Sequence, residues 1–363
     1  MKTSIFVFNP YPAIGGADTT LLRFVSSVDF KKYNLTYISL TNIKKFSKKI
    51  KFIKINSNST FLSFLTIKKI INQDKSPKKI FFSMQYFVNV CAILFLRKIK
   101  KLKIFIYEIN HPIELDHSHS FVEYLKKKII KFLVKRIYHR ADLVAANCME
   151  LSKDISQMIS KKVETIYNPC FFKIIQASTK KRILNKINIL NISRFEHQKD
   201  HLTLLKAIQC SKIKNKIQLN LVGYGSQESV IKNYANKNNI NYKIYKNKTK
   251  LSYFYKSNDL FVLTSIYEGL PTVMIEAASY CMPIISSKFK SGSLEILGNG
   301  KFGHVFPVGD YKLLAKLLNN FNDKPQIFYS KEKRCRKNLS NFSYINNLKK
   351  FNISLKKLSN KIV

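Results

Sequence analysis

The sequence of 363 residues contains no tryptophan, and only 21 Asp and Glu residues stand against 64 Lys and Arg. The formal net charge of +43 at pH 7 favours polyanions as partners, either nucleic acid or an anionic membrane surface. Compositional drift explains the excess equally well, because Lys, Asn, Ile and Phe are abundant together. Such a charge bears on association and leaves the fold to be read from the pattern of residues.

Cysteine is also scarce. The six cysteines, at positions 91, 148, 170, 210, 281 and 335, form no C-x-x-C pair and no cluster. This spacing is typical of a reducing compartment, and it argues against both a disulfide framework and a structural zinc site.

Long apolar runs are missing as well. The first eight residues hold too short an apolar run for a signal peptide. The longest apolar stretch, 81–96, is interrupted by Ser83, Gln85 and Asn89 and falls short of the roughly 20 residues that a spanning helix needs. We therefore expect a cytoplasmic protein, either soluble or peripheral at the inner face of the membrane.

Short apolar runs alternate with longer helical stretches along the whole chain, which is typical of a doubly wound α/β architecture. The pattern starts with a strand at 4–8, stops at Tyr167-Asn168-Pro169, and restarts with a strand at 187–192. We predict two α/β domains, 1–168 and 187–340, joined by a linker at 169–186 and followed by a helical segment at 341–363.

The segment 259–276 carries the clearest chemical signal. An apolar strand at 260–263 leads into a turn, Glu268-Gly269-Leu270-Pro271, and a helix follows with Glu276 among apolar neighbours. A buried carboxylate is costly without a partner, and a strand end followed by a Gly turn and a helix N-terminus forms an anion site. The segment therefore predicts a ligand that has both hydroxyls and phosphates, such as a nucleotide sugar.

Two cations follow the strand at 187–192. Arg194 and Lys199 come where ligands of open α/β sheets bind, beyond the carboxyl ends of the strands. Arg can hold a phosphate through two hydrogen bonds, and Lys supplies a compact point charge. The competing interpretation is a pair of solvated surface cations, because the chain has 64 basic residues.

Three residues of the first half are weaker candidates. Gly15 and Gly16 follow the first strand but match neither G-x-G-x-x-G nor a Walker A sequence, so they support only a close approach of the backbone. His111 precedes Pro112 in a polar loop, which disfavours a core histidine. A metal cluster in this loop is conceivable, but no helical or paired spacing organises its members. Those members are His111, Glu114, Asp116, His117 and His119.

Taken together, these segments resemble the retaining nucleotide-sugar glycosyltransferases of the GT-B type. They are similar to family 4 and to the large group in which seven residues separate two glutamates. The resemblance rests on segments from both halves of the chain, which occur in the family's order. They are Gly15-Gly16-Ala17-Asp18, His111, 141–144, 166–169, Ser193-Arg194, Gln198-Lys199, 221–225, Glu268–Pro271 with Glu276, 300–303 and 307–310. The resemblance implies two Rossmann-like domains that face a cleft, the first on the acceptor side and the second binding the donor. The C-terminal helical segment could cross back to the first domain.

The resemblance also implies a role for each candidate residue. Arg194 and Lys199 would neutralise the donor diphosphate and the charge on the leaving group. Glu268 would contact the donor sugar, the backbone of Gly269, Leu270 and Pro271 would hold sugar and phosphate, and Glu276 would bind the ribose hydroxyls. His111 would reach the sugar, and Gly15 and Gly16 would approach the phosphate or the acceptor. The chain has no Asp-x-Asp, so we expect a hexosyltransferase without metal or other cofactor.

Four positions depart from the family pattern. Ser193 and Asp200 stand where Gly is usual, Asp18 stands where Glu is usual, and Met282 replaces a Gly before Pro283. Asp200 adds negative charge near the expected phosphates. Alternatively, it caps the helix that begins near His201, which would leave the site intact.

The function implied by the resemblance is transfer of a sugar from a UDP- or GDP-sugar to a glycan or lipid-linked acceptor. This reaction would serve the synthesis of cell-surface polysaccharide, lipopolysaccharide or capsule. Basic segments at 44–54, 97–103 and 126–140 mix Lys with apolar residues and could hold the protein on an anionic membrane. A solvated basic face is the alternative interpretation.

Two other classes of function are open. A nucleotide-sugar epimerase or a sugar phosphorylase can be built on the same architecture, although the Glu268–Glu276 spacing favours a transferase. A basic nucleic-acid-binding protein is more distant. The sequence has no helix-turn-helix, RNP-like or zinc-finger pattern, so we expect no specific nucleic-acid partner.

Overall fold

The computed structural model describes residues 2–12, 15–42, 47–118, 120–175, 185–248 and 250–362. They form two compact units: unit 1 comprises Met1–Pro169 and Tyr344–Val363, and unit 2 comprises Cys170–Ser343. Three expectations fall partly outside the described residues. They concern residues 176–184 of the linker, 44–46 of the first basic segment, and His119.

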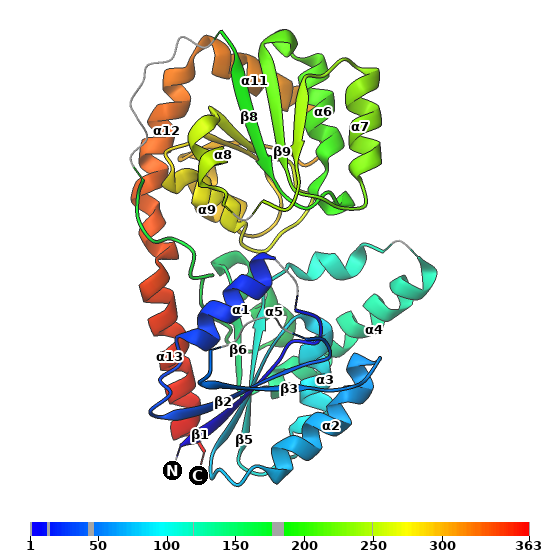
Figure 1. The fold of residues 1–363 in the computed structure, drawn as a ribbon, viewed down its shortest axis with the longest axis vertical. Coiled ribbons are helices and arrows are strands. Elements are labelled where there is room, and N and C mark those ends of the chain that lie inside the picture. The colour runs from blue at the N-terminus through cyan, green and yellow to red at the C-terminus, as the bar shows by residue number, and fades with distance from the viewer. Residues whose placement is uncertain are drawn as a thin grey trace. The chain divides into compact units, whose positions relative to one another are not determined.

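Unit 1 is built on a seven-stranded sheet with the order β3-β2-β1-β4-β5-β6-β7, in which every pair is parallel (Figure 1). The first strand therefore lies inside the sheet, with β2 and β3 on one side and the later strands on the other. The strands are β1 (Thr3–Phe8), β2 (Tyr33–Ser39), β3 (Ile50–Lys54), β4 (Lys79–Met84), β5 (Leu102–Glu108), β6 (Leu143–Ala146) and β7 (Glu164–Thr165).

Helices cover both faces of this sheet, which is why the central strands are apolar at successive positions and not at alternate ones. On β1, Ile5 and Val7 belong to the core beneath α1 and α13, whereas Phe8 packs edge-on against Phe64 of α2, with ring centroids 5.3 Å apart. The helices are α1 (Gly16–Ser26), α2 (Thr60–Gln73), α3 (Tyr86–Leu96), α4 (Phe121–Ile137), α5 (Met149–Ile159) and α13 (Tyr344–Asn360), with 3-10 turns at Pro112–Asp116 and Tyr138–Arg140.

The last helix, α13, is part of unit 1 although more than 170 residues separate it from the rest of that unit. Phe351 stacks on Phe24 of α1 at 4.5 Å and contacts the rings of Phe82 and Phe105. Leu355 and Leu358 extend the same core. The C-terminal helical segment therefore crosses back to the first half of the chain.

Unit 2 repeats the winding of unit 1 in a six-stranded parallel sheet with the order β10-β9-β8-β11-β12-β13 (Figure 1). Its first strand, β8, again lies inside the sheet. The strands are β8 (Ile187–Ile192), β9 (Ile217–Val222), β10 (Tyr242–Tyr245), β11 (Leu260–Leu263), β12 (Ile284–Ser287) and β13 (His304–Phe306).

The helices of unit 2 also lie on both faces of its sheet. They are α6 (His201–Cys210), α7 (Glu228–Lys237), α8 (Ser252–Ser257), α9 (Thr272–Ser279), α10 (Ser293–Ile296), α11 (Tyr311–Asp323) and α12 (Pro325–Asn338), with 3-10 turns at His197–Lys199, Lys214–Lys216, Gly298–Gly300 and Leu339–Phe342. Part of the predicted linker belongs to this unit, because the Phe171 amide donates to the Phe342 carbonyl and the Ile175 amide to the Ser279 carbonyl. Among the described residues, no helix combines the length and the apolar character needed to cross a bilayer.

A buried polar network lies at the carboxyl end of β5 in unit 1. The carboxylate oxygen Oε1 of Glu108 accepts hydrogen bonds from Tyr138 Oη at 2.5 Å and from Asn89 Nδ2 at 2.7 Å. No described residue pairs with its Oε2. Burial disfavours the ionised form and raises the pKa of Glu108 to about 8.

The position of Phe351 yields a prediction about the stability of unit 1. Phe351→Ala removes a fully buried ring from the core, so we expect a loss of about 3–5 kcal/mol in the free energy of unfolding. The exposed Ile353 on the same helix provides the control, and Ile353→Ala should change the stability by no more than about 0.5 kcal/mol. Urea unfolding followed by circular dichroism measures both, and equal effects would contradict the packing described above.

Glu108 gives a prediction about pH. Because its folded pKa of about 8 lies above the ordinary value of 4.5, its contribution to stability is complete below pH 4.5 and is lost as the pH rises towards 8. Glu108→Gln cannot ionise, so its stability should gain on the wild type by up to about 1.4 kcal/mol per pH unit across this window. Urea unfolding of both proteins at pH 5, 6, 7 and 8 measures the difference, and a constant difference would refute the assignment.

Candidate active site

The candidate residues of unit 2 gather where the winding of its sheet reverses. The strands β8 and β11 are neighbours, and the chain leaves β8 for β9 on one side and reaches β11 on the other. Arg194 and Lys199 follow β8, and Glu268 follows β11. Ligands of doubly wound sheets bind at this reversal, beyond the carboxyl ends of the strands.

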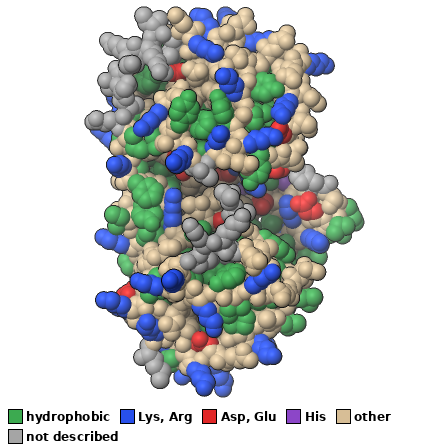
Figure 2. All heavy atoms as spheres, viewed as in Figure 1, with side chains coloured by type: hydrophobic (Ala, Val, Ile, Leu, Met, Phe, Trp, Pro, Cys, Tyr) green, Lys and Arg blue, Asp and Glu red, His purple; other side chains and the backbone are tan. Residues whose placement is uncertain are grey.

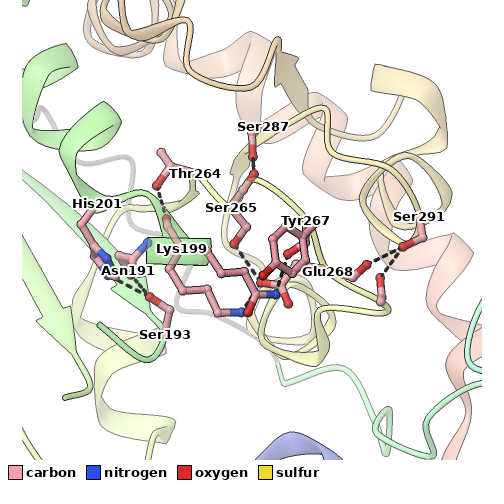
Figure 3. Close-up of polar contacts among 12 residues, drawn as sticks. Asn191, Ser193, Lys199, His201, Thr264, Ser265, Tyr267, Glu268, Ser287 and Ser291 are labelled. Carbon is pink, nitrogen blue, oxygen red and sulfur yellow. Dashed lines mark hydrogen bonds and ion pairs between the residues drawn. The ribbon is translucent and has the colours of Figure 1, made fainter. Parts of the chain in front are cut away.

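Lys199 and Glu268 form an ion pair between the ammonium Nζ and the carboxylate Oε1 (Figure 3). Their side chains are only 12% and 11% exposed. Ser265 also donates its hydroxyl to Glu268 Oε1 at 2.8 Å, so the largely buried carboxylate has two donors. The structure thus brings together two residues to which the family resemblance gives separate roles, Lys199 at the diphosphate and Glu268 at the sugar.

The two loops that carry this pair are joined by hydrogen bonds to their backbone carbonyls. Thr264 donates its hydroxyl to the Lys199 carbonyl at 2.9 Å, and Gln198 donates its amide to the Tyr267 carbonyl at 2.7 Å. The Ile266 amide donates in turn to the Gln198 carbonyl. These bonds fix the position of Lys199 relative to Glu268 without using either charged group.

The turn Glu268–Pro271 is held from behind by the loop after β12. The hydroxyl of Ser291 donates to the Glu268 carbonyl at 2.6 Å (Figure 3). Gly292 follows with φ of +22°, and a Cβ there would lie 2.3 Å from the Gly269 carbonyl oxygen. Only glycine permits this approach, which seats the turn at the start of α9.

Ser193, one of the departures from the family pattern, belongs to a hydrogen-bonded chain behind Arg194. Its hydroxyl donates to Asn191 Oδ1 at 2.7 Å and lies 2.9 Å from His201 Nε2. Since the hydroxyl proton goes to Asn191, His201 must donate from Nε2. Asn191 also donates to the Val262 carbonyl of β11, so the chain ties the two strand ends together. Burial lowers the pKa of His201 to about 3, and the imidazole is neutral at physiological pH.

Asp200 lies at the start of α6 and acts as its cap. Its backbone is left-handed, with φ of 46°, and its carboxylate accepts from the Thr203 amide at 3.2 Å and from the Thr203 hydroxyl at 2.6 Å. The alternative interpretation of this departure, a helix cap, is therefore confirmed. The charge of Asp200 is engaged by the helix terminus.

Arg194 is exposed, and no described residue pairs with its guanidinium. Its backbone is fixed on both sides: the Ser193 amide donates to the Val222 carbonyl, and the Phe195 amide donates to the Tyr224 carbonyl. The loop after β9 passes so close that a Cβ on Gly223 would lie 1.9 Å from the Ser193 carbonyl oxygen. Arg194 thus combines a fixed backbone with a solvated cationic group.

Glu276 lies in the middle of α9 and is half-buried. Its Oε2 accepts a hydrogen bond from Tyr255 Oη at 2.8 Å, and Tyr255 stacks on Tyr280. Burial raises the pKa of Tyr255 well above its ordinary value, so the phenol stays a donor. This bond is the partner that a carboxylate among apolar neighbours requires.

His111, Gly15 and Gly16 belong to unit 1. His111 is only 6% exposed; its Nδ1 accepts from the Ile113 amide at 3.1 Å, and its Nε2 donates to Asp154 at 2.8 Å. His111 does lie in a loop, at the cap of the 3-10 turn Pro112–Asp116. The expectation that this position disfavours a core histidine was wrong, because the ring is buried and both of its nitrogens are hydrogen-bonded. Gly15 caps α1, and Gly16 begins it, next to the winding reversal between β1 and β4.

The polar loop after His111 does not gather metal ligands among the described residues, where no group of three His, Cys, Asp or Glu side chains could hold an ion. Asp116 pairs instead with Lys131 of α4. Sequence reasoning missed the supporting residues Ser265, Ser291 and Tyr255. Their roles depend on contacts between loops far apart in the chain, and a lone Ser or Tyr carries no local signal.

Comparison with known proteins bears on the same region. The family description "Glycosyl transferases group 1" matches residues 174–342, which is nearly all of unit 2. A protein of Methanocaldococcus jannaschii, described as an uncharacterised glycosyltransferase, is 28% identical over 294 residues, covering 72% of this chain and 70% of the relative.

A second relative, from Campylobacter jejuni, is 24% identical over 330 residues, or 88% of this chain and 86% of the relative. It is an α-1,4-N-acetyl-D-galactosaminyltransferase named for a glycan on diphospho-undecaprenol. Among solved structures, Anabaena HepE in complex with UDP-glucose superposes with a TM-score of 0.77 over 98% of this chain and 99% of HepE, at 15% identity. The fold is therefore GT-B, most of unit 2 matches the group 1 glycosyltransferases, and these similarities support glycosyltransferase activity.

Proposed function

We propose that this enzyme transfers a hexose, with retention and without a metal ion, from a nucleoside diphosphate donor to a glycan or lipid-linked acceptor. The observation that carries the proposal is the Lys199–Glu268 pair beside the exposed Arg194 at the winding reversal of unit 2. Support for a UDP-sugar comes from HepE, whose structure contains UDP-glucose. Support for a lipid-linked acceptor comes from the Campylobacter relative. Cell-surface polysaccharide, lipopolysaccharide or capsule would be the product, made at the cytoplasmic face of a membrane.

The charges of this site suit a donor diphosphate. Arg194 offers a planar group that can hold two phosphate oxygens at once, with no competing partner among the described residues. Lys199 adds a second cation whose charge is largely out of water, where it interacts more strongly with an anion. When the bond between the sugar C1 and the phosphate oxygen breaks, its electron pair passes to the diphosphate, and both cations stabilise that charge.

The glutamates hold the rest of the donor. Glu268 would accept hydrogen bonds from hydroxyls of the donor sugar, and the backbone of Gly269, Leu270 and Pro271 would line the sugar and phosphate. Glu276, oriented by Tyr255, would bind the ribose. Neither glutamate acts as a nucleophile: the acceptor oxygen attacks C1 from the side of the leaving group and passes its proton to the departing phosphate oxygen.

Residues of unit 1 complete the proposed assignment. His111 would contact the donor sugar, and Asp154 and the Ile113 amide hold its ring as the neutral Nε2–H tautomer. Gly15 and Gly16 would let the backbone approach the phosphate or the acceptor. Among the described residues, a Cβ on Gly15 would meet Asp18 Oδ2 alone, at 3.8 Å.

Replacement of Arg194 tests the diphosphate assignment. Arg194→Ala should lower the transfer rate by about 10²–10³, the range for loss of one group that stabilises a developing anion, and Lys199→Ala should act in the same direction. The matched control is Lys216→Ala, which lies just before β9 at the amino ends of the strands. It should leave the rate unchanged. Transfer from a panel of UDP- and GDP-sugars measures the effect.

Two results of these assays would overturn the proposal. Near-normal transfer by Arg194→Ala would remove the diphosphate assignment, and loss of activity in EDTA that Mg²⁺ or Mn²⁺ restores would remove the metal-independent mechanism. Turnover of the nucleotide sugar without any acceptor would instead identify an epimerase.

Replacement of Ser193 tests whether the hydrogen bonds among Ser193, Asn191 and His201 support donor binding by Arg194. Ser193→Ala leaves the buried Nε2–H of His201 without an acceptor, so we expect a loss of about 1–3 kcal/mol in stability and weaker donor binding through a looser Arg194 loop. Ser226 donates to Glu196 at the exposed surface, and Ser226→Ala should have little effect. Thermal unfolding with and without UDP-glucose measures both quantities, and identical behaviour of the two variants would refute the supporting role.

A further inference from the structure

Helix α4 presents apolar side chains to solvent. Phe121, Leu125, Ile129 and Phe132 are 73%, 46%, 59% and 57% exposed. They are spaced by four, four and three residues, so they form a single stripe along the helix. Only Val134 and Ile137, in the last turn, are buried. We call these four residues the α4 stripe.

The opposite side of α4, which faces the rest of unit 1, carries charged residues. Lys127 donates to the His117 carbonyl at 2.6 Å and pairs with Glu123. Lys131 pairs with Asp116 of the preceding 3-10 turn. Over the first three turns, the exposed side of α4 is therefore more apolar, and the side towards unit 1 more charged, than is usual for a surface helix.

Basic side chains lie beside the stripe on the exposed side of the helix. Lys126, Lys128, Lys135 and Arg136 are all exposed. Arg136 lies over the ring of Phe132, with 5.4 Å between its guanidinium carbon and the ring centroid. Figure 2 shows apolar and basic side chains together at the edge of the molecule where α4 projects in Figure 1. A composition rich in Lys accounts for the cations, but it does not place four large apolar residues in water.

We propose that α4 lies flat on an anionic phospholipid bilayer. The stripe inserts at the boundary between headgroups and acyl chains, and the four cations beside it contact lipid phosphates. An anionic bilayer is complementary to both features, because its acyl region accepts the apolar stripe and its phosphates accept the cations beside it. The α4 stripe and its cations would hold the enzyme at the membrane, where a lipid-linked acceptor resides. This role of the surface rests on the proposed function.

The test uses the full-length protein and vesicles of phosphatidylcholine with or without 30% phosphatidylglycerol. We expect the wild type to cosediment with the anionic vesicles only. Replacement of the whole stripe by Ser leaves the net charge unchanged and should reduce partitioning at least tenfold. Ile345→Ser with Ile353→Ser removes two exposed apolar residues of α13 (62% and 53% exposed) and should leave partitioning unchanged.

The charge component has its own pair of variants. Replacement of Lys126, Lys128, Lys135 and Arg136 by Gln should reduce binding to anionic vesicles and its sensitivity to salt. Lys312→Gln with Lys316→Gln, on α11 of unit 2, is the control and should bind as the wild type does. Thermal unfolding checks that each variant is folded; if the four-residue stripe variant is not, Phe121→Ser with Leu125→Ser replaces it.

Three outcomes would overturn the proposal. They are equal binding of the wild type to neutral and anionic vesicles, no binding to either, and a stripe variant that binds as well as the wild type. If that last variant also converts a dimer to a monomer in sedimentation velocity, the stripe is an interface between two copies. Donor binding is measured on the same variants by the thermal shift with UDP-glucose. If UDP-glucose gives no thermal shift while vesicle binding is intact, the proposed function is contradicted and the proposed membrane surface is not.

Discussion

In each unit, the first strand lies inside a parallel sheet, and the chain builds outward from it first to one side and then to the other. Where the strand order reverses, the connections from two neighbouring strands run to opposite sides of the sheet. The loops that follow these strands therefore leave a crevice between them. Parallel strands also bring all their carboxyl ends to one edge. The positions of Arg194, Lys199 and Glu268 follow from this one constraint on topology.

The site at this edge in unit 2 is held by bonds that leave its charged groups available to a ligand. The side chains of Thr264 and Gln198 donate to backbone carbonyls and fix the two loops. The hydrogen bond between Ser193 and His201 fixes the strand end behind Arg194. A largely buried ion pair needs further hydrogen bonds to offset the lost hydration of its charges, and Ser265 donates one to the carboxylate. Under the proposed function, a donor diphosphate would replace the carboxylate as the partner of Lys199 while these bonds stay in place.

The charge of the chain has no comparable role in the fold. Among the described residues, most Lys and Arg side chains lie on the surface, where single ion pairs contribute little to stability. On α4, however, cations lie next to an exposed apolar stripe, and this arrangement is specific to that helix. Composition alone could not distinguish that arrangement from a solvated basic face.

Much of the architecture was predictable, because burial on both faces of a parallel sheet produces continuous apolar runs. The strands predicted at 4–8, 187–192 and 260–263 agree with β1, β8 and β11 to within a residue. The strand β3 and the helices α2 and α3 were not predicted. In β3 the mixture of Lys and apolar residues obscures the alternation. In α3 nearly every residue is apolar and most are buried, so the sequence shows no helical periodicity.

By itself, the sequence determined the α/β class, the two halves, and the residue types at the strand ends, since each depends on patterns within about 20 neighbouring residues. Only the tertiary structure decided that Lys199 pairs with Glu268, that Asp200 caps α6, and that α13 completes the core of unit 1. It also decided which side of α4 faces water. These features depend on contacts between distant segments or on small changes in backbone direction, and a local pattern of residues specifies neither.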